Sequence, residues 1–402
     1  MAENTGAANT RVVVIGGGYA GTMAANRLTR REGAAVTLIN PRPQFVERIR
    51  LHQLVGGTHD AVHDFRDVLA KGVRLVLDSA SRIDAAERAV LLESGETVEY
   101  DYLVYAVGSA GARPTVPGAV DFAHPLSTLE DARRARAAVD AAPAAAAVTV
   151  VGAGPTGIET AAELAERGRT VTLVTGGVLA PYFHPGARRA LCARLSRLGV
   201  EVLDGAGSRA AEVSRAVVRL EDGREVRSDV TLWTAGFAVP DLAVRSGLRT
   251  DAAGRLLTDE TLTSADSPRI VAAGDSAAPS GVAYRMSCQA ALPLGSHAAD
   301  TVLARIAGAT PREVAVGFVA QCVSTGRRTG LLQLASSDDH AKKSFVGGRS
   351  GAALKEAICW STYQALLLEA KHPGSVNWAF IRDGHRAGLL EASHRRYVAR
   401  TA

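Results

Sequence analysis

Cysteine is scarce in this chain of 402 residues. The four cysteines lie far apart, with no Cys-x-x-Cys or Cys-x4-Cys pair among them; they are Cys192, Cys288, Cys322 and Cys359. This spacing excludes the closely spaced thiols of a dithiol relay and the paired ligands of a structural zinc site. Unpaired thiols are typical of a reducing compartment.

Long apolar runs are also absent, and none reaches the roughly 20 residues that a membrane-spanning helix needs. The N-terminal MAENTGAANT has neither the basic nor the apolar region of a secretory signal, so we expect a cytoplasmic protein. The net charge of +5 arises in residues 311–402. Such a basic excess is usually a solvated face, and the alternative is contact with an anionic lipid surface or partner. We expect no nucleic-acid site.

Apolar residues, by contrast, are plentiful enough for large cores. Hydrophobic residues make up 47% of the chain and charged residues 22%, which is typical of a globular protein. The length of 402 residues predicts two or three domains.

The segment RVVVIGGGYAG, residues 11–21, predicts a strand, a glycine-rich turn and a helix. The first glycine of such a turn permits a tight bend, the second lets the backbone approach a pyrophosphate, and the third lets the helix pack closely on the strand. These are Gly16, Gly18 and Gly21. Because the helix N-terminus offers free N–H groups and partial positive charge, we expect a dinucleotide there.

The same pattern occurs a second time. The apolar residues 147–151 lead into GAGPTG, with Gly152, Gly154 and Gly157 at the three glycine positions, followed by a helical stretch that ends at Gly168. The blocks ESGETVEYDYLVYAVG (93–108) and EDGREVRSDVTLWTAG (221–236) also match, each with a hairpin turn and a strand that ends in glycine. Two copies at similar spacing predict two dinucleotide-binding domains, each with a β-meander. Prolines at 114, 117 and 125 mark a linker before a helix that starts at Thr128.

Polar residues at the strand ends bear on which dinucleotide binds. Asn40 stands where many such folds have an acid for the adenosine ribose, and Arg42 nearby suits a phosphate or the adenine ring. In the second copy, Thr175-Gly176-Gly177 has neither an acid nor an arginine, so NADH and NADPH both remain open. A later buried strand ends in Gly274-Asp275, and Asp275 either binds a ribityl chain or caps a helix.

These motifs resemble the two-dinucleotide-binding-domain flavoproteins of the pyridine nucleotide-disulfide oxidoreductase superfamily, over residues 11–305. VTLIN, YDYLVYAVGS, GPTGIETAAELAE and LWTAGF are most similar to the type II NADH dehydrogenase and apoptosis-inducing-factor-like branch. The resemblance implies FAD in the first copy and NADH or NADPH in the second. It implies FAD contacts at Gly16, Gly18, Gly21, Asn40, Arg42, Ala80, Gly108, Gly274 and Asp275, and nicotinamide dinucleotide contacts at Gly152, Gly154, Gly157 and Gly236.

The resemblance also implies a catalytic role for Glu159, which would position the nicotinamide or relay protons. The alternative is a carboxylate stabilised merely by the dipole in the first turn of a helix. In quinone-reducing relatives an AQxxxQ-like helix follows the Gly-Asp pair. Here Gln289 matches the first glutamine but Pro293 replaces the second, so we take both as candidate substrate-binding positions. A sulfide:quinone-type pair of Cys288 and Cys322 is a further alternative to inert buried thiols.

The C-terminal region, residues 311–402, predicts a meander and an amphipathic helix over 354–371, with Leu354, Ile358, Ala365 and Leu366 toward one face. Core packing or a homodimer interface is the expected use of this helix, and weak contact with the inner face of a membrane is the alternative. The tail after Pro373 is Arg-rich and has no further apolar helix.

The fold class that follows is α/β, with two Rossmann-like domains, each with a β-meander, and a C-terminal α+β region. We expect FAD-binding parts at 1–125 and 248–310, an NAD(P)H-binding domain at 126–247 and an interface or substrate region at 311–402. The predicted reaction passes hydride from the nicotinamide to flavin N5 and then electrons to a quinone or another small organic acceptor. Three alternatives stay open: a slow NAD(P)H-sensing flavoprotein, a biosynthetic FAD-dependent oxidoreductase and a ferredoxin reductase.

Overall fold

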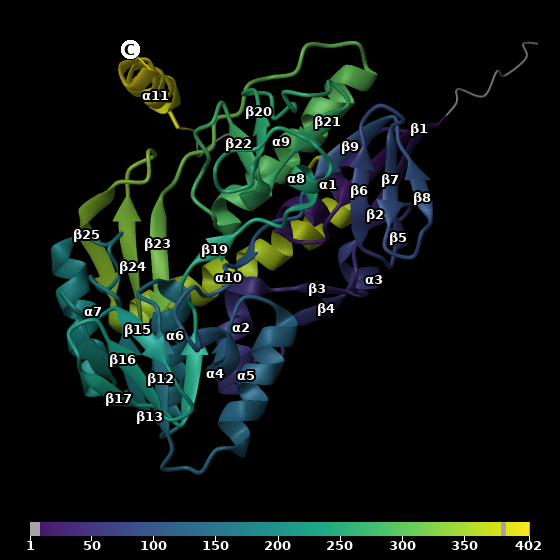
Figure 1. Ribbon diagram of the computed structural model, residues 1–402. Helices are drawn as coiled ribbons and strands as arrows, with labels where there is room; N and C mark the ends of the chain where they lie inside the picture. The colour runs from purple at the N-terminus through teal and green to yellow at the C-terminus, as the bar shows by residue number, and fades with distance from the viewer. Residues whose placement is uncertain (1–8, 379–382, 402) are drawn as a thin grey trace, which may run out of the picture.

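The computed structural model describes residues 9–378 and 383–401 (Figure 1). The N-terminal strand is the central strand of its first sheet. Five parallel strands lie in the order β21-β9-β1-β2-β5. They are β1 (Thr10–Ile15), β2 (Ala34–Ile39), β5 (Arg74–Val76), β9 (Tyr102–Tyr105) and β21 (Ile270–Ala272). Residues 12–15 of β1 are at most 4% exposed, so both faces of the strand are buried. A strand buried on both faces needs an apolar residue at every position, which explains the continuous apolar run. The predicted strands at 12–15 and 35–39 are confirmed.

Two helices pack side by side on this sheet, α1 (Tyr19–Leu28) and α9 (Cys288–Ile306). The two helices approach so closely at Gly295 that a Cβ there would lie 2.2 Å from the Ala20 carbonyl oxygen. The predicted meander is confirmed as β6 (Ala80–Asp84), β7 (Ala89–Leu92) and β8 (Thr97–Glu99). The other elements of this part are β3 (Gln44–Val46), η1 (Arg48–Arg50), α2 (Leu51–Gly56), β4 (Val62–Asp64), α3 (Phe65–Val68), α8 (Leu242–Arg245), β20 (Leu256–Thr258), η2 (Gly274–Ser276) and β22 (Ala277–Pro279).

The second parallel sheet repeats the first, with strand order β11-β18-β12-β13-β14. Its strands are β11 (Ala123–Pro125), β12 (Ala147–Val151), β13 (Thr170–Val174), β14 (Glu201–Leu203) and β18 (Val230–Trp233). The helices are α4 (Ala119–Phe122), α5 (Leu129–Ala141), α6 (Pro155–Glu166) and α7 (Pro185–Arg197), and the meander is β15 (Ala210–Val213), β16 (Val217–Leu220) and β17 (Glu225–Arg227). The repeat in the sequence is thus a repeat of the whole supersecondary unit.

The two units are joined by a short ribbon of β10 (Ala110–Gly111) and β19 (Phe237–Ala238), which pair antiparallel. The predicted helix start is confirmed: Thr128 caps α5, and its side chain and that of Asp131 bond reciprocally to backbone N–H groups. Arg42 forms two hydrogen bonds of 2.6 Å with Glu130 of α5, which ties the first unit to the second.

The C-terminal region is an antiparallel sheet of β23 (Ala320–Ser324), β24 (Gly330–Ala335) and β25 (Ala341–Gly347), followed by α10 (Gly348–Lys371). The meander is confirmed, but α10 begins six residues earlier than predicted. Its predicted face is wrong at Leu354, which is 42% exposed. The buried positions are Gly351, Lys355, Cys359, Thr362, Leu366 and Glu369. An apolar pattern could not predict this face, because it buries one cation and one acid that have partners elsewhere in the chain.

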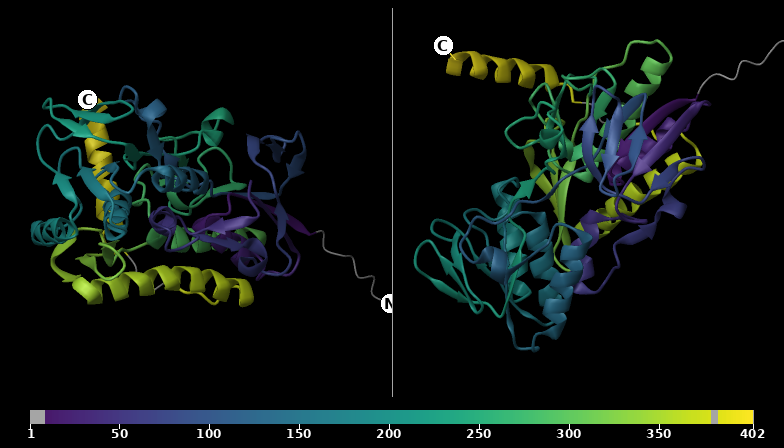
Figure 2. Two further views of the ribbon diagram at one scale, coloured as in Figure 1. Left: turned by 90° about the horizontal axis from the view of Figure 1, so that it is seen from below. Right: turned by 45° about the vertical axis from the view of Figure 1, so that its right-hand side comes forward.

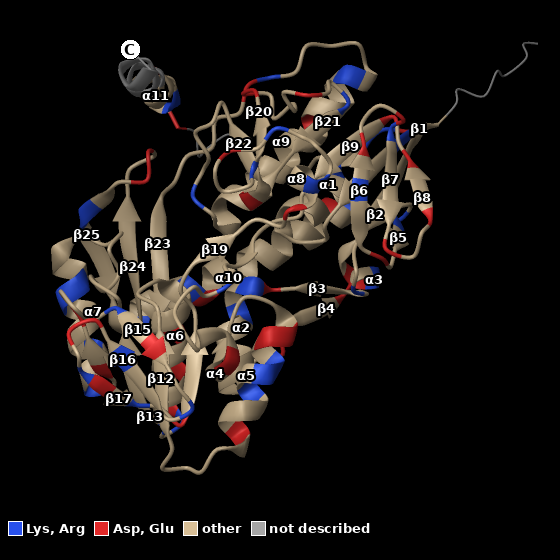
Figure 3. Cartoon of the chain, in the orientation of Figure 1, with Lys and Arg blue, Asp and Glu red and all other residues tan. Residues whose placement is uncertain are grey.

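Helix α10 runs along one edge of the molecule, from the C-terminal sheet to the first domain (Figure 2). Helix α11 (Arg386–Thr401) follows, and Arg386 at its start forms a 3.0 Å ion pair with Glu260. Acidic and basic residues are interspersed over both dinucleotide units (Figure 3). Among residues 9–378 and 383–401, no helix combines the length and the apolar character that a bilayer crossing requires.

Candidate functional site

The first glycine turn has the shape of a pyrophosphate cradle. A Cβ at Gly21 would lie 1.8 Å from the Gly16 carbonyl oxygen, and one at Gly16 would lie 2.4 Å from that of Ala106, so the turn and the start of α1 admit only glycine there. A Cβ at Gly18 meets no atom within 4 Å. The backbone is thus tight behind the turn and open in front of the helix N-terminus, where a diphosphate of FAD fits.

The strand-end residues near this turn already have partners within the chain. The Asn40 side chain accepts a hydrogen bond of 2.9 Å from the Gly17 N–H and donates one of 2.8 Å to the Arg42 carbonyl. It therefore braces the glycine turn. Ala80 opens β6 and pairs with Leu92. The roles of Asn40, Arg42 and Ala80 toward adenosine stay predictions.

Asp275 lies beside the ends of β9 and β21, in a single 3-10 turn with Gly274. Asp275 is not the N-cap of a helix, because the helix that follows, α9, is capped by Ser287. This removes the alternative interpretation of Asp275 as a helix cap. Ser109 donates a 2.6 Å hydrogen bond to Asp275 and accepts one of 3.1 Å from Arg48. Burial raises the pKa of Asp275, and Ser109 and Arg48 oppose that shift.

Gly108 lies three residues after the end of β9, with φ +69 and open space where a Cβ would stand. Together these groups present hydrogen-bonding atoms at the carboxyl edge of the first sheet, where ligands of such folds bind.

The second glycine turn repeats the geometry of the first. A Cβ at Gly157 would lie 2.2 Å from the Gly152 carbonyl oxygen, whereas one at Gly154 meets nothing within 4 Å. Gly236, with φ +86, follows β18 at the same edge of its sheet. The second cradle therefore also fits a dinucleotide, and the assignment of NAD(P)H to it stays a prediction.

Glu159 is the centre of a buried cluster that brings four elements together. It lies in α6, past the first turn, and is 5% exposed, so the dipole alone does not account for it. Its Oε1 is 2.7 Å from Lys355 Nζ of α10 and accepts a 3.0 Å hydrogen bond from the Ser324 N–H of β23. Its Oε2 is 3.3 Å from His52 Nδ1 of α2. His52 Nε2 is in turn 3.3 Å from Ser324 Oγ.

The charges of this cluster follow from its partners. Burial opposes ionisation of Glu159, yet Lys355 and His52 hold its pKa below the usual range. Burial would lower the pKa of Lys355, but Glu159 and two neighbouring thiols raise it. Burial lowers the pKa of His52 to about 4 despite the attraction of Glu159. At neutral pH the cluster therefore holds a carboxylate, an ammonium and a neutral imidazole whose Nδ1 proton faces the carboxylate.

The lowered pKa of His52 predicts acid sensitivity. The unfolded chain binds a proton at His52 near pH 6.5 and the folded chain only near pH 4, so stability falls as the pH drops through this interval. When the pH falls from 7 to 5, we expect the free energy of unfolding of the wild type to decrease by about 2 kcal/mol more than that of His52→Gln. Urea unfolding at both pH values measures this difference. His372→Gln, at an exposed histidine, is the control, and an equal pH loss in wild type and His52→Gln would contradict a neutral buried imidazole.

The predicted acceptor positions differ in how the chain uses them. With its amide oriented by its neighbours, Gln289 donates to the Ala320 carbonyl and accepts from the Val319 N–H, both at 3.0 Å. It thus ties α9 to the chain entering β23. Pro293 lies inside α9 and is buried, so it is part of the packing between helices. Substrate binding by Gln289 and Pro293 remains a prediction.

All four cysteines are free thiols. Burial raises the pKa of Cys288 to about 12 and that of Cys359 to about 11, and it also raises the pKa of Cys322. Because the thiolate is the reactive form, these groups are poor nucleophiles at neutral pH. The interpretation as inert thiols is therefore favoured over a redox pair.

Five residues of these sites escape the sequence patterns: Arg48, His52, Ser109, Ser324 and Lys355. Ser109 directly follows the YDYLVYAVG block, so its position at a strand end could have marked it. His52 and Lys355 carry a weaker signal, as ionisable residues inside otherwise apolar stretches. Their convergence on Glu159 depends on contacts between segments more than 100 residues apart.

Comparison with known proteins identifies the family of this chain. The model of the pyridine nucleotide-disulphide oxidoreductase family matches residues 10–298. A NADH dehydrogenase-like protein of Mycobacterium tuberculosis is 33% identical over 323 residues, covering 73% of this chain and 80% of that protein. The type II NADH:quinone oxidoreductase Ndh of the same organism is 29% identical over 346 residues, covering 75% and 74%.

A solved structure, NDH2 from Plasmodium falciparum with NADH, has a TM-score of 0.75 at 15% identity and covers 93% of this chain and all of that one. This likeness confirms the fold class. The chain belongs to the pyridine nucleotide-disulphide oxidoreductase family, and it is an FAD-dependent oxidoreductase that takes electrons from NADH or NADPH.

Proposed function

We propose that this oxidoreductase passes its electrons to a quinone. One relative, 29% identical, is the type II NADH:quinone oxidoreductase Ndh of Mycobacterium tuberculosis, and another, 28% identical, is a demethylphylloquinone reductase of Synechocystis. The sequence has no Cys-x-x-Cys or Cys-x4-Cys pair to act as an intermediate carrier, and burial raises the pKa of the Cys288, Cys322 and Cys359 thiols. Electrons would therefore pass directly between FAD and the acceptor.

The observation that carries the proposal is the buried cluster at Glu159. When bound, FAD accepts a hydride from the reduced nicotinamide and returns two electrons to an acceptor. Glu159 lies in the helix whose N-terminus forms the second cradle, and Lys355, His52 and Ser324 hold its carboxylate in one orientation. We infer that it accepts a hydrogen bond from the nicotinamide amide. A proton donor would need a pKa near neutrality, and the pKa of Glu159 is shifted away from it.

The other chain atoms divide the work of binding. The FAD diphosphate would be held by Gly16, Gly18 and Gly21. The ribityl chain would be held by Asp275, together with Ser109 and Arg48. Gly152, Gly154, Gly157 and Gly236 would hold the nicotinamide dinucleotide. With this assignment, the FAD domain comprises 1–125 and 248–310, the NAD(P)H domain 126–247 and the interface region 311–402. Two short elements cross these proposed boundaries: β11 (Ala123–Pro125) pairs with β18 of the second sheet, and α8 (Leu242–Arg245) packs on β6 of the first unit.

A second acceptor class, a small organic molecule other than a quinone, is favoured by α9. Pro293 has no amide to offer, and the Gln289 amide already bonds to Val319 and Ala320. A quinone would therefore have to compete with these backbone groups for Gln289. We rank this class of acceptor second because none of the residues that the structure describes favours one particular small organic molecule.

We also propose weak contact of α10 with the inner face of a membrane. Three large apolar side chains of this helix are exposed, namely Leu354 (42%), Trp360 (60%) and Leu368 (48%). Flotation with anionic vesicles measures this contact, and a concentration-dependent dimer without flotation would assign the surface to a second copy.

Anaerobic titration of the purified holoenzyme tests the proposed reaction. NADH or NADPH should bleach the flavin absorbance, and a short-chain quinone should restore it over many turnovers. Glu159→Gln should slow flavin reduction by at least about tenfold while FAD stays bound, because a neutral amide is a weaker acceptor and loses the Lys355 pairing.

Three outcomes would contradict the proposal. A long-lived reduced complex with a persistent charge-transfer band would indicate the sensing function. Reoxidation by a ferredoxin but not by a quinone would indicate a ferredoxin reductase. Unchanged flavin reduction in Glu159→Gln would remove Glu159 from the mechanism.

A further inference from the structure

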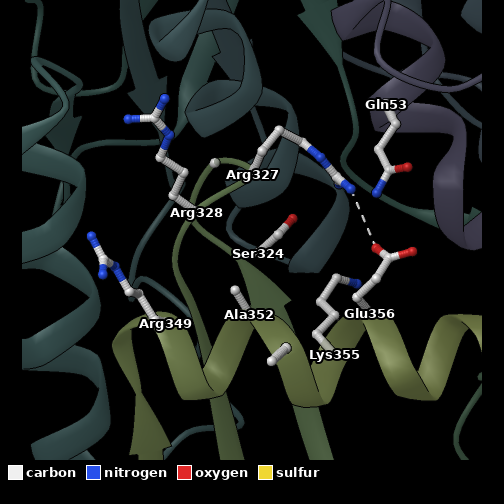
Figure 4. A pocket seen from close by; sticks show the side chains of 10 residues that line it. Gln53, Ser324, Arg327, Arg328, Arg349, Ala352, Lys355 and Glu356 are labelled. Carbon is white, nitrogen blue, oxygen red and sulfur yellow. Dashed lines mark hydrogen bonds and ion pairs between the residues drawn. The ribbon is translucent and has the colours of Figure 1, made fainter.

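A cavity of about 270 Å³ lies between α10, the β23–β24 turn and α2, outside both dinucleotide cradles (Figure 4). Four cationic side chains line it: Arg327, Arg328, Arg349 and Lys355. Glu356 is the one acid among its lining residues, and Gln53 and Ser324 add neutral polar groups. The lining thus carries a clear excess of positive charge.

This positive charge is only partly balanced by the protein. Glu356 forms ion pairs of 2.6 Å with Arg50 and 3.3 Å with Arg327, and Arg327 reaches across the cavity to make its pair (Figure 4). Arg328 and Arg349 have neither an ion pair nor a hydrogen bond with any residue that the structure describes. Both side chains lie on the side of the cavity away from Glu356 (Figure 4), so their guanidinium groups are available to an anion at this edge.

The turn that supplies two of these arginines is held in place from both sides. Glu166, at the end of α6, accepts a 2.6 Å hydrogen bond from the Arg327 N–H, and Arg194 of α7 donates one of 2.7 Å to Thr329 Oγ1. Gly326, with φ +87, leaves no room for a side chain, since a Cβ would lie 2.0 Å from the Glu166 carboxylate. The cationic edge of the cavity is therefore preorganised at the backbone.

The first two turns of α10 form the floor of the cavity, through Arg349, Ala352 and Ala353. The N-cap residue, Gly347, makes no side-chain cap, so the positive end of the helix adds to the arginines. Lys355 lies at the inner side, where its ammonium also binds Glu159. Arginine forks bind carboxylate and phosphate oxygens in pairs, and that geometry selects planar or tetrahedral oxyanions over halides.

We propose that this cavity binds a small polyanion, a molecule with at least two carboxylate or phosphate groups. A volume of about 270 Å³ admits a compound of roughly ten to fifteen non-hydrogen atoms at ordinary packing density. The site is separate from the NAD(P)H cradle. Glu166, which contacts the β23–β24 turn, lies about 18 Å along the α6 axis from Gly154 at the glycine turn, and only the inner side of the cavity, at Lys355 and Ser324, reaches Glu159 in the middle of the helix.

Binding of pyrophosphate and of citrate to the FAD-loaded protein tests the proposal. At constant ionic strength set with NaCl, each probe at millimolar concentration should raise the Tm by at least about 3 °C. Titration calorimetry should show one site. In Arg328→Gln/Arg349→Gln the Kd should rise at least about tenfold, because both unpaired guanidinium groups are removed. A stronger effect of pyrophosphate assigns a phosphorylated ligand, and a stronger effect of citrate assigns a polycarboxylate.

Arg215→Gln is the matched control, since Arg215 is exposed and lies in the loop between β15 and β16. It should bind both probes as the wild type does. Equal Kd values in the wild type and the double arginine variant would overturn the proposal. So would displacement of pyrophosphate by NADH, which would place the anion in the dinucleotide cradle. These results do not depend on the electron acceptor, so a failure here leaves quinone reduction untouched.

Discussion

A Gly21→Ala variant is expected to lose bound FAD and at least about 3 kcal/mol of stability. The new methyl group would lie 1.8 Å from the Gly16 carbonyl oxygen and 3.0 Å from its carbon, which are backbone atoms of the first cradle. The turn and the helix must move apart to accept it, and Gly16 itself is held against Ala106. Urea unfolding and the flavin absorbance of the purified protein measure the two losses.

Gly18→Ala separates damage to the fold from damage to the ligand site. Its Cβ meets no protein atom within 4 Å, and its φ of −80 suits alanine, so stability should stay within about 0.5 kcal/mol of the wild type. FAD affinity should nevertheless fall by at least about tenfold, because the methyl group enters the space in front of the helix N-terminus. Normal FAD binding by Gly18→Ala would mean that the diphosphate does not lie against this glycine.

A Lys355→Met variant should lose about 3–5 kcal/mol of stability and most of its turnover. Lys355 and Glu159 are both buried and their charged atoms are 2.7 Å apart, so removal of the ammonium leaves a buried carboxylate with only His52 and a backbone N–H as partners. The pKa of Glu159 should then rise. Lys355→Met should therefore lose less stability than the wild type as the pH falls through the carboxylate range, since a folded-state pKa of Glu159 closer to or above that of the unfolded chain shrinks or reverses the loss on acidification.

The double variant Glu159→Gln/Lys355→Met shows whether the pair acts as a unit. It removes both charges, so it should recover at least half of the stability that Lys355→Met loses. Lys371→Met, at an exposed lysine of the same helix, is the control and should change stability by no more than about 0.5 kcal/mol. Additive effects of Glu159→Gln and Lys355→Met would contradict a direct pairing.

Local patterns predicted most of the architecture correctly. Strand, glycine turn and helix follow one another within about 25 residues in both copies, and each step depends on nearby residues. Residues 12–15 form a buried strand, as their apolar run predicts. At Gly21 and Gly157 a side chain would collide with the backbone of the preceding turn. Thr128 caps the helix that follows it directly in the sequence. The internal repeat then established two domains without any long-range information.

The C-terminal helix shows where such patterns fail. Apolar periodicity placed Leu354 inside, yet the structure buries Lys355 and Glu369. Glu369 accepts hydrogen bonds from the Gly374 and Val376 N–H groups, of 2.6 and 2.9 Å, and Lys355 pairs with Glu159. A buried charge is stable only with its partner, and the partner of Lys355 lies almost 200 residues away in the chain.

The sequence by itself determined the two dinucleotide cradles, because glycine spacing and helix N-termini act over a few residues. Only the tertiary structure decided which groups surround Glu159, and it did so by bringing α2, α6, β23 and α10 to one point. The same folding placed Arg349 of α10 beside Arg327 and Arg328 of the β23–β24 turn. Electrostatic interactions depend on distance in space, and no single segment contains the information about which charges meet.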